Sequence, residues 1–185
     1  MNTYISMLRG INVSGQKKVS MEELRKLYES LRLKSVRTYI QSGNVVFQHP
    51  DTDTAKLASK IEEKIKQYFD FDVSVLIRTK NEFQAVIENN PFRNKDPGKI
   101  HVTFMSDGPT GIQVDDINKV KERSEGFSIY GKQIYLFCPN GYGKSKLSNT
   151  FFERKLKVTA TTRNWKTVSA LFEIANSMHV RKLLP

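Results

Sequence analysis

Three loop segments carry the polar and basic side chains that are best suited to bind an anion. The first, 9–18, follows an apolar segment and contains two glycines, one asparagine and two lysines. Glycines let backbone N–H groups turn toward one point, and a helix N-terminus after such a turn favours a negative charge. The alternative is a purely structural turn between a strand and a helix. The predicted ligands in this loop are Arg9, Gly10, Asn12 and Lys17.

The second segment, 138–145, reads Cys-Pro-Asn-Gly-Tyr-Gly-Lys-Ser and ends like the phosphate-binding loop of many nucleotide-binding proteins. That loop requires a glycine where this chain has Cys138, and Pro139 removes an amide donor. We therefore expect a basic turn near a helix and not a true phosphate-binding loop. The predicted ligands from this region are Lys144, Ser145 and Lys146.

The third segment, 159–167, combines threonines, a guanidinium, an amide and an indole. We expect one of its threonines to cap the last helix, so that the first helical turn faces an anion or an aromatic base. The residues predicted on this turn are Arg163, Asn164 and Trp165. For Trp165 by itself, a place in the core is the stronger interpretation.

No pair of carboxylates stands out for acid–base catalysis, and the sequence shows no activated nucleophile and no metal-binding motif. His49, His101 and His179 are far apart in the sequence and have no metal-ligand spacing. The single cysteine, Cys138, is expected to be a buried bystander. We therefore predict no metal and no cofactor, and the catalytic residues of any reaction stay unknown.

The charge of the chain favours an anionic partner. Its 30 Lys and Arg against 19 Asp and Glu give a net charge of +11 over 185 residues. Residues 132–166 contain eight basic side chains and one acidic side chain. Such a surface attracts phosphates and polyanions, although a lysine-rich surface can also serve solubility alone. We expect the partner to be a nucleic acid or a phosphorylated small molecule.

The pattern of apolar residues predicts the elements that must position these loops. In the first half we expect a β-α-β-β-α-β order, typical of ferredoxin-like folds, at 3–8, 21–32, 36–40, 44–47, 54–69 and 73–77. The turn 41–44 between two of these strands adds Ser42 and Asn44 to the predicted site. The second half repeats the order less clearly, with a terminal helix in place of the last strand.

The predicted fold is therefore α+β, with two ferredoxin-like (βαββα-type) subdomains that have antiparallel sheets, the second ending in helices. The predicted boundaries are 1–88 for the first subdomain, 89–99 for a linker, and 100–185 for the second subdomain with its basic helical region. On one strand Tyr135 and Phe137 share a face, as an RNA-stacking platform requires, but we expect them to be buried because the RNA-recognition signature is missing.

Composition also restricts where the protein acts. One cysteine suits a reducing compartment, and the chain has neither a leader-like N-terminus nor an apolar run of about 18 residues. We expect a cytoplasmic protein without a membrane span.

Three segments resemble the signature blocks of a widespread bacterial family, domain of unknown function 1697. They read LRGINV at 8–13, VRTYIQSGNV at 36–45 and TRNWKT at 162–167. The resemblance spans nearly the whole chain and implies an α+β fold with ferredoxin-like character, without an established activity. In the first block Ser14 replaces a glycine that is common in the family. The residues on motif positions are Arg9, Gly10, Asn12, Gln41, Ser42, Gly43, Asn44, Ser145, Lys146, Thr162, Arg163, Asn164 and Trp165.

The leading hypothesis is a protein that binds a phosphate-bearing or other anionic partner in a basic cleft formed by these loops. The first alternative is a small-molecule enzyme that holds an anionic substrate with Arg9, Lys146 and Arg163, and a pocket with a perturbed His, Cys or Lys would favour it. The second alternative is a protein-interaction module, which would expose a large apolar patch.

Overall fold

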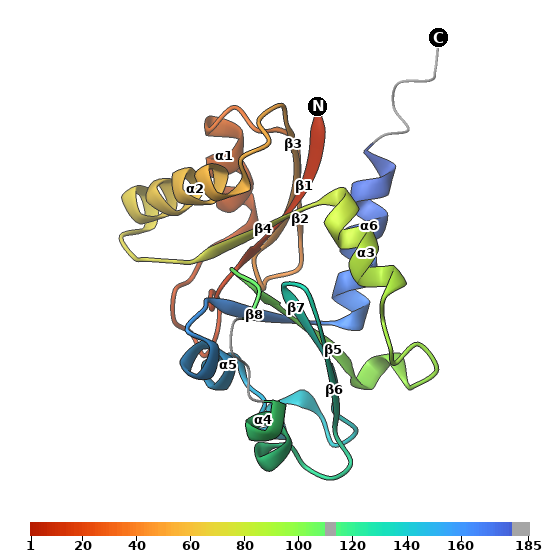
Figure 1. The fold of residues 1–185 in the computed structure, drawn as a ribbon. Helices are drawn as coiled ribbons and strands as arrows, with labels where there is room; N and C mark the ends of the chain where they lie inside the picture. The colour runs from red at the N-terminus through yellow and green to blue at the C-terminus, as the bar shows by residue number, and fades with distance from the viewer. Residues whose placement is uncertain (110–113, 179–185) are drawn as a thin grey trace. The chain divides into compact units, whose positions relative to one another are not determined.

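The computed structural model describes residues 1–109 and 114–178, which divide into two compact units (Figure 1). The first unit contains Met1–Ala85 and the chain from Ala170 onward, and the second contains Val86–Ser169. Within the described residues each unit has one four-stranded antiparallel sheet and its own helices. The predicted α+β fold with two subdomains is confirmed.

The unit boundaries differ from the expected 1–88, 89–99 and 100–185. The first boundary falls inside α3 (Lys80–Glu88), and α6 (Trp165–Ser177) also crosses from one unit to the other. The segment expected to be a linker belongs to the second unit and includes the short 3-10 helix η1 (Pro97–Lys99). A Pro- and Asn-rich composition resembles that of a linker, although here it forms an ordered connection.

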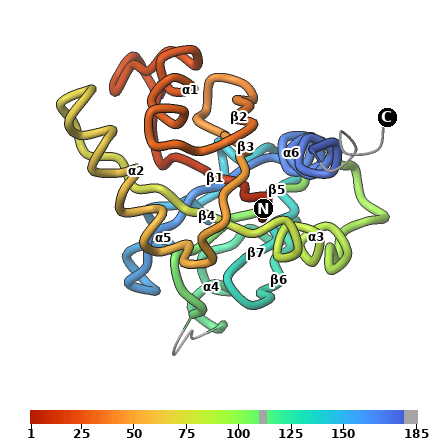
Figure 2. The backbone as a smooth tube through the Cα atoms, turned by 90° about the horizontal axis from the view of Figure 1, so that it is seen from above, coloured from red at the N-terminus to blue at the C-terminus, as the bar shows by residue number. Residues whose placement is uncertain are grey.

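The first unit has the predicted β-α-β-β-α-β order. Its elements are β1 (Asn2–Leu8), α1 (Met21–Ser30), β2 (Lys34–Tyr39), β3 (Asn44–His49), α2 (Thr54–Phe69) and β4 (Val75–Thr79). The strand order in the sheet is β2-β3-β1-β4. Helices α1 and α2 lie on one face of the sheet, as Figure 2 shows, and the core of the unit lies between them and the strands.

Local side chains define where these two helices begin. The Ser20 hydroxyl caps α1 by accepting a hydrogen bond from the Glu23 N–H at 3.1 Å. The Asp53 carboxylate caps α2 by accepting from the Lys56 N–H at 2.9 Å. Apolar residues at helical spacing then turn toward the sheet, where the rings of Tyr4 and Phe47 stack with centroids 5.5 Å apart.

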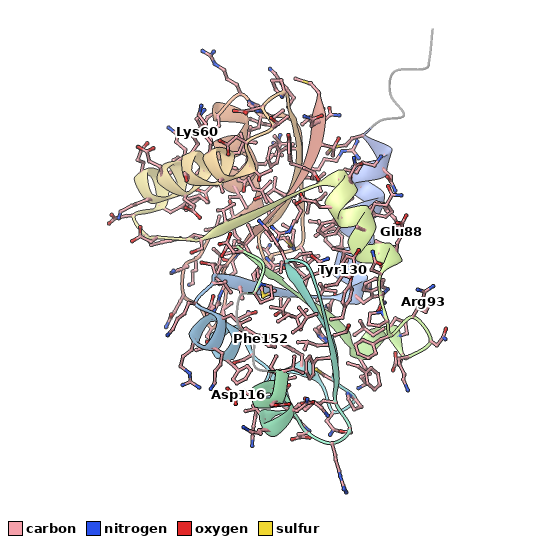
Figure 3. The ribbon with its side chains drawn as sticks, in the orientation of Figure 1. Lys60, Glu88, Arg93, Asp116, Tyr130 and Phe152 are labelled. Carbon is pink, nitrogen blue, oxygen red and sulfur yellow. The ribbon has the colours of Figure 1, made fainter. Side chains whose placement is uncertain are left out.

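The second unit has the same element order and includes a strand that the sequence analysis missed. Its elements are β5 (Ile100–Met105), α4 (Val114–Val120), β6 (Gly126–Tyr130), β7 (Gln133–Phe137), η2 (Tyr142–Lys144), α5 (Asn149–Leu156) and β8 (Ala160–Asn164). The strand order is β6-β7-β5-β8. Strand β8 pairs with β5, so the second unit does have a last strand. The prediction that a terminal helix replaces this strand is wrong. The core of this unit includes Phe152 of α5, labelled in Figure 3.

The last strands of the two units correspond residue by residue. Thr79 of β4 lies opposite Tyr4, and Asn164 of β8 lies opposite His101. Arg78 and Arg163, one residue earlier in each strand, are both buried, and each donates to the carbonyl of its preceding residue, at 3.0 and 2.9 Å. A helix follows directly in both cases. The two units therefore share their topology and this detailed junction, despite little local sequence similarity.

Tyr135 does not form a base-stacking platform. Its side chain is fully buried, and its hydroxyl donates to the Val86 carbonyl at 2.9 Å. Burial raises the pKa of Tyr135 to about 12. Phe137, on the same strand face, packs beside Phe92 with ring centroids 6.0 Å apart. The expected burial of Tyr135 is confirmed.

In the part of the chain that the structure covers, no helix combines the length and apolarity needed to cross a membrane.

Candidate functional site

Asn12 closes the first loop through hydrogen bonds to other parts of the protein. Its side-chain oxygen accepts from the Val19 N–H at 2.9 Å, and its amide nitrogen donates to the Val19 and Gln41 carbonyls at 2.9 and 2.8 Å. Its backbone N–H donates to the Lys17 carbonyl at 3.1 Å. These bonds use the donors of the amide, so the geometry gives Asn12 a structural role.

The turn at 41–44 packs directly on this loop. Gly43 has a φ of +72°, and a Cβ on it would lie 2.7 Å from Ile11 Cδ1 and 2.8 Å from Leu8 Cβ. The Gly43 carbonyl also accepts from the Leu8 N–H at 2.8 Å. The position therefore requires glycine for both its conformation and its space. Gly10, with a φ of +70°, allows the chain to turn at the start of the loop.

Asn44 and Ser42 stabilise the same turn from inside. Asn44 is fully buried, and its amide nitrogen donates to the Tyr39 carbonyl at 3.1 Å and to the Ser42 hydroxyl at 2.9 Å. A buried side-chain amide fixes a turn because a buried amide without hydrogen-bond partners would lower the stability of the fold. The motif residues of the first two blocks therefore explain how this part of the chain folds.

Arg9 and Lys17 line an open groove of about 600 Å³ in the first unit. Lys17 Nζ donates to the Asp72 carbonyl at 2.6 Å, and Lys66 forms an ion pair with the Asp72 carboxylate at 3.0 Å. Among the described residues that line this groove, three are basic and three are acidic. The groove therefore has no basic surplus and gives little attraction to an anion.

The turn with Lys144, Ser145 and Lys146 is basic and exposed, as expected. Lys144 and Lys146 reach solvent, and the Ser145 hydroxyl accepts from the Leu147 N–H at 3.1 Å. Ser145 has an extended backbone after η2, and α5 begins only at Asn149. The chain therefore does not run from this turn straight into a helix, as a phosphate-binding loop does.

Arg163 and Asn164 lie in β8 and not on a helical turn, which corrects the expected placement. The Arg163 guanidinium is buried and donates to the Thr161 hydroxyl at 2.8 Å as well as to the Thr162 carbonyl. Asn164 takes the capping role expected of a threonine, because its side-chain oxygen accepts from the Thr167 N–H at 2.8 Å. Both residues therefore serve the local fold.

Trp165, the first residue of α6, is half-buried and lines a cavity of about 290 Å³ in the second unit. The residues that share this lining come from the end of α3, the following loop and the start of β5. They are Ile87, Glu88, Asn90, Arg93, Lys95, Pro97 and Ile100. Figure 3 labels Glu88 at the end of α3 and Arg93 on the loop. We call this the Trp165 cavity.

The loop that carries the two cations of this cavity is held by its own hydrogen bonds. The buried Asn90 side chain accepts from the Phe92 N–H at 2.9 Å, and the Lys95 N–H donates to the Phe92 carbonyl at 2.8 Å. The Arg93 guanidinium reaches the Glu88 carbonyl at a long 3.5 Å, and Lys95 Nζ lies 5.6 Å from the centre of the Phe137 ring. Both cations are exposed and weakly held, so they can contact a ligand.

The electrostatic balance of the Trp165 cavity differs from that of the Arg9 groove. Among its described lining residues, Arg93 and Lys95 are basic and Glu88 is the one acid. A lining that combines an indole, a guanidinium and an ammonium with apolar residues suits a ligand with a flat ring and a negative charge.

Two groups that could act in an enzyme lie away from this cavity. Burial raises the pKa of the Cys138 thiol to about 11, which keeps it protonated and unreactive. Burial lowers the pKa of His101, whose ring stacks on Tyr142 with centroids 4.9 Å apart. Neither residue is part of the cavity lining. The third histidine of the sequence, His179, lies outside the described residues.

Comparison with known proteins identifies the family. The model for a protein of unknown function, DUF1697, matches residues 1–135. The chain belongs to the DUF1697 family. A solved structure of a conserved bacterial protein from Streptococcus pneumoniae is similar to it, with 28% sequence identity and a TM-score of 0.71, over 94% of this chain and 98% of that chain. No curated protein matches the chain.

Within this DUF1697 protein, the matched stretch contains the Asn12 loop and the 41–44 turn, and it ends before Trp165. The first two motif blocks account for folding of the first unit. The family is described as one of unknown function, and the similar structure is described as a conserved bacterial protein. The residues that line its cavities are therefore the basis for a functional proposal.

Sequence reasoning missed Arg93 and Lys95 because it interpreted residues 89–99 as a linker. One signal was available: the connection is much longer than the usual two to six residues, and long ordered loops are often functional.

Proposed function

We propose that this protein binds a phosphate-bearing ligand with an aromatic base, of the nucleotide type, in the Trp165 cavity. The observation that carries the proposal is the shared lining of one cavity by Trp165, Arg93 and Lys95. An indole can stack on a base, while the guanidinium and the ammonium can neutralise a phosphate. A cavity of about 290 Å³ is near the lower end of the range for small-ligand sites, which suits one nucleotide unit.

The charge of the second unit supports the same ligand class. Residues 86–169 contain 14 basic and 8 acidic side chains, and the exposed Lys144 and Lys146 belong to this surplus. In the proposal these two lysines contact further phosphates of a polymer. A free nucleotide and a single-stranded nucleic acid then share the Trp165 cavity and differ in their need for the two lysines.

Trp165 also provides the test, because it is the one tryptophan in the chain. Its fluorescence is followed while a mononucleotide, a short single-stranded RNA or pyrophosphate is added at about 50 mM salt. We expect saturable quenching by the two ligands that contain a base, and a weaker response to pyrophosphate. No saturable change with any of the three ligands would overturn the proposal.

Matched variants locate the binding. Arg93→Gln and Lys95→Gln are each expected to weaken binding about tenfold, since a charge-assisted hydrogen bond contributes about 1.5–3 kcal/mol. Lys60→Gln removes an exposed charge from α2 in the first unit and serves as the control. Lys144→Gln with Lys146→Gln should weaken RNA binding alone if the ligand is a polymer. Equal effects of Lys60→Gln and Arg93→Gln would show that only overall charge matters.

A further inference from the structure

The first unit has a cavity at the position that corresponds to the Trp165 cavity of the second unit. Lys80 follows Thr79 at the start of α3, just as Trp165 follows Asn164 at the start of α6. By the same strand pairing, Thr3 corresponds to Ile100. Thr3 and Lys80 line a cavity of about 350 Å³, and Ile100 and Trp165 line the other. We call the first one the Thr3 cavity.

The lining of the Thr3 cavity is rich in hydrogen-bond donors. Hydroxyls come from Thr3 and Thr52, amides come from the neighbouring asparagines, and Lys80 supplies an ammonium. The Thr79 hydroxyl also lies in the lining, but it donates to the Glu82 carboxylate. The described residues of this lining include no carboxylate, and Lys80 forms no ion pair with any described residue. An ammonium surrounded by neutral donors suits an oxyanion.

The Thr3 hydroxyl is a second, independent pointer to a ligand. Thr3 is 3% exposed, and its hydroxyl oxygen is buried without a hydrogen-bond partner among the described residues. Buried hydroxyls are nearly always paired in folded proteins, so an unpaired one beside a polar cavity calls for an explanation. A ligand oxygen that accepts from this hydroxyl would supply one, and because the oxygen has less than 1 Å² of accessible surface, the Thr3 side chain has to rotate toward the cavity to make that bond.

The start of α3 adds its electrostatic field to the cavity. The first-turn N–H groups of Lys80 and Asn81 have no carbonyl partner within the helix, and the helix dipole favours an anion there. Glu82 opposes this effect in part. Its carboxylate accepts from the Thr79 N–H at 2.7 Å and from the Thr79 hydroxyl at 2.9 Å, which holds it at the same helix end.

We infer that the Thr3 cavity binds a phosphate group, either as free phosphate or as a small phosphate ester. The site needs one anionic group and no aromatic ring, because its lining has the Lys80 ammonium where the Trp165 cavity has an indole. Glu82 lowers the affinity and Lys80 raises it. This inference does not depend on the proposed function of the Trp165 cavity.

The test uses the full chain labelled with ¹⁵N and titrated with inorganic phosphate and, separately, with glycerol 3-phosphate. We expect saturable shifts of the Thr79, Lys80 and Asn81 amide signals, with a dissociation constant of order 1 mM. Tighter binding of the ester would identify a phosphorylated metabolite as the ligand, and equal or weaker binding would identify free phosphate. The absence of saturable shifts at these three amides with both probes would overturn the inference.

Variants separate this site from the Trp165 cavity. Lys80→Gln should weaken phosphate binding at least tenfold, and Thr3→Val, which keeps the side-chain shape, should weaken it several-fold. Glu82→Gln should strengthen binding, because it removes a like charge. Arg93→Gln and Lys60→Gln should leave the phosphate shifts unchanged. Unaltered binding in both Lys80→Gln and Thr3→Val would contradict the inference, whatever the result at Trp165.

Discussion

The amide nitrogen of Asn12 donates a hydrogen bond to the Gln41 carbonyl at 2.8 Å and thereby joins the first loop to the β2–β3 turn. The two residues belong to separate segments, 8–13 and 36–45, and the bond holds these segments together. Their shared role is to hold the first unit in its fold, and the ligand site that we propose instead lies in the second unit.

Asn12→Ala should destabilise the protein by about 2–3 kcal/mol, because it leaves the Val19 N–H and the Gln41 carbonyl without their partner. Urea unfolding followed by circular dichroism measures the change. Ser14→Ala is the control, since Ser14 lies in the same loop with a similar φ of +50°. A loss below about 0.5 kcal/mol for Asn12→Ala would show that the loop does not depend on this side chain.

Gly43→Ala should be more destabilising than Gly15→Ala, although both glycines have a positive φ. A Cβ at Gly43 would lie 2.7 Å from Ile11 Cδ1, whereas a Cβ at Gly15 meets nothing within 4 Å. We expect about 1–2 kcal/mol of conformational cost at each position and a further steric cost at Gly43 alone. Denaturant midpoints of the two variants measure the difference, and equal midpoints would refute the steric argument.

Stability should fall as the pH decreases below about 6.5, and His101 should be one cause. Burial lowers the folded-state pKa of His101 from its ordinary value of 6.5, so the unfolded chain takes up the proton first. The loss begins near the unfolded pKa and ends below the folded pKa. Unfolding curves between pH 7.5 and 4.5 should show a smaller decrease for His101→Leu than for the parent protein. If the free energy of unfolding decreases equally with pH in His101→Leu and in the parent protein, His101 does not contribute to the pH dependence.

Cys138 should be almost inert in the native protein. It is 1% exposed, and burial raises its pKa to about 11. Because the thiolate is the reactive form, labelling with a thiol-specific disulfide reagent at pH 8 should be at least 100-fold slower in buffer than in concentrated urea. Rapid labelling of the folded protein would mean that the thiol is accessible.

Much of the fold was predictable because its signals are local. The spacing of apolar residues indicated both helices of the first unit, and Thr54–Phe69 is the span that the pattern predicted for α2. Strand β8 was missed because it contains few apolar residues. Its threonines are β-branched, which favours a strand, but we interpreted them as helix caps. The cap is in fact Asn164.

The sites were less predictable, because they depend on which distant segments meet. Arg163 has the residue type of an anion ligand, but its place in β8 buries it. Arg93 and Lys95 stand in a stretch whose composition resembles a linker, and only the fold brings them to Trp165. The unpaired Thr3 hydroxyl has no sequence signal at all, since a threonine in a strand is ordinary.

The salt dependence of RNA binding tests the central claim most directly. If Arg93 and Lys95 each contact a phosphate, the Arg93→Gln, Lys95→Gln double variant should lower the slope of log K against log salt by about 1.4, at about 0.7 per contact with a single strand. The Lys60→Gln control should keep the parent slope. A double variant with the parent slope and affinity would contradict the assignment of the Trp165 cavity as the binding site.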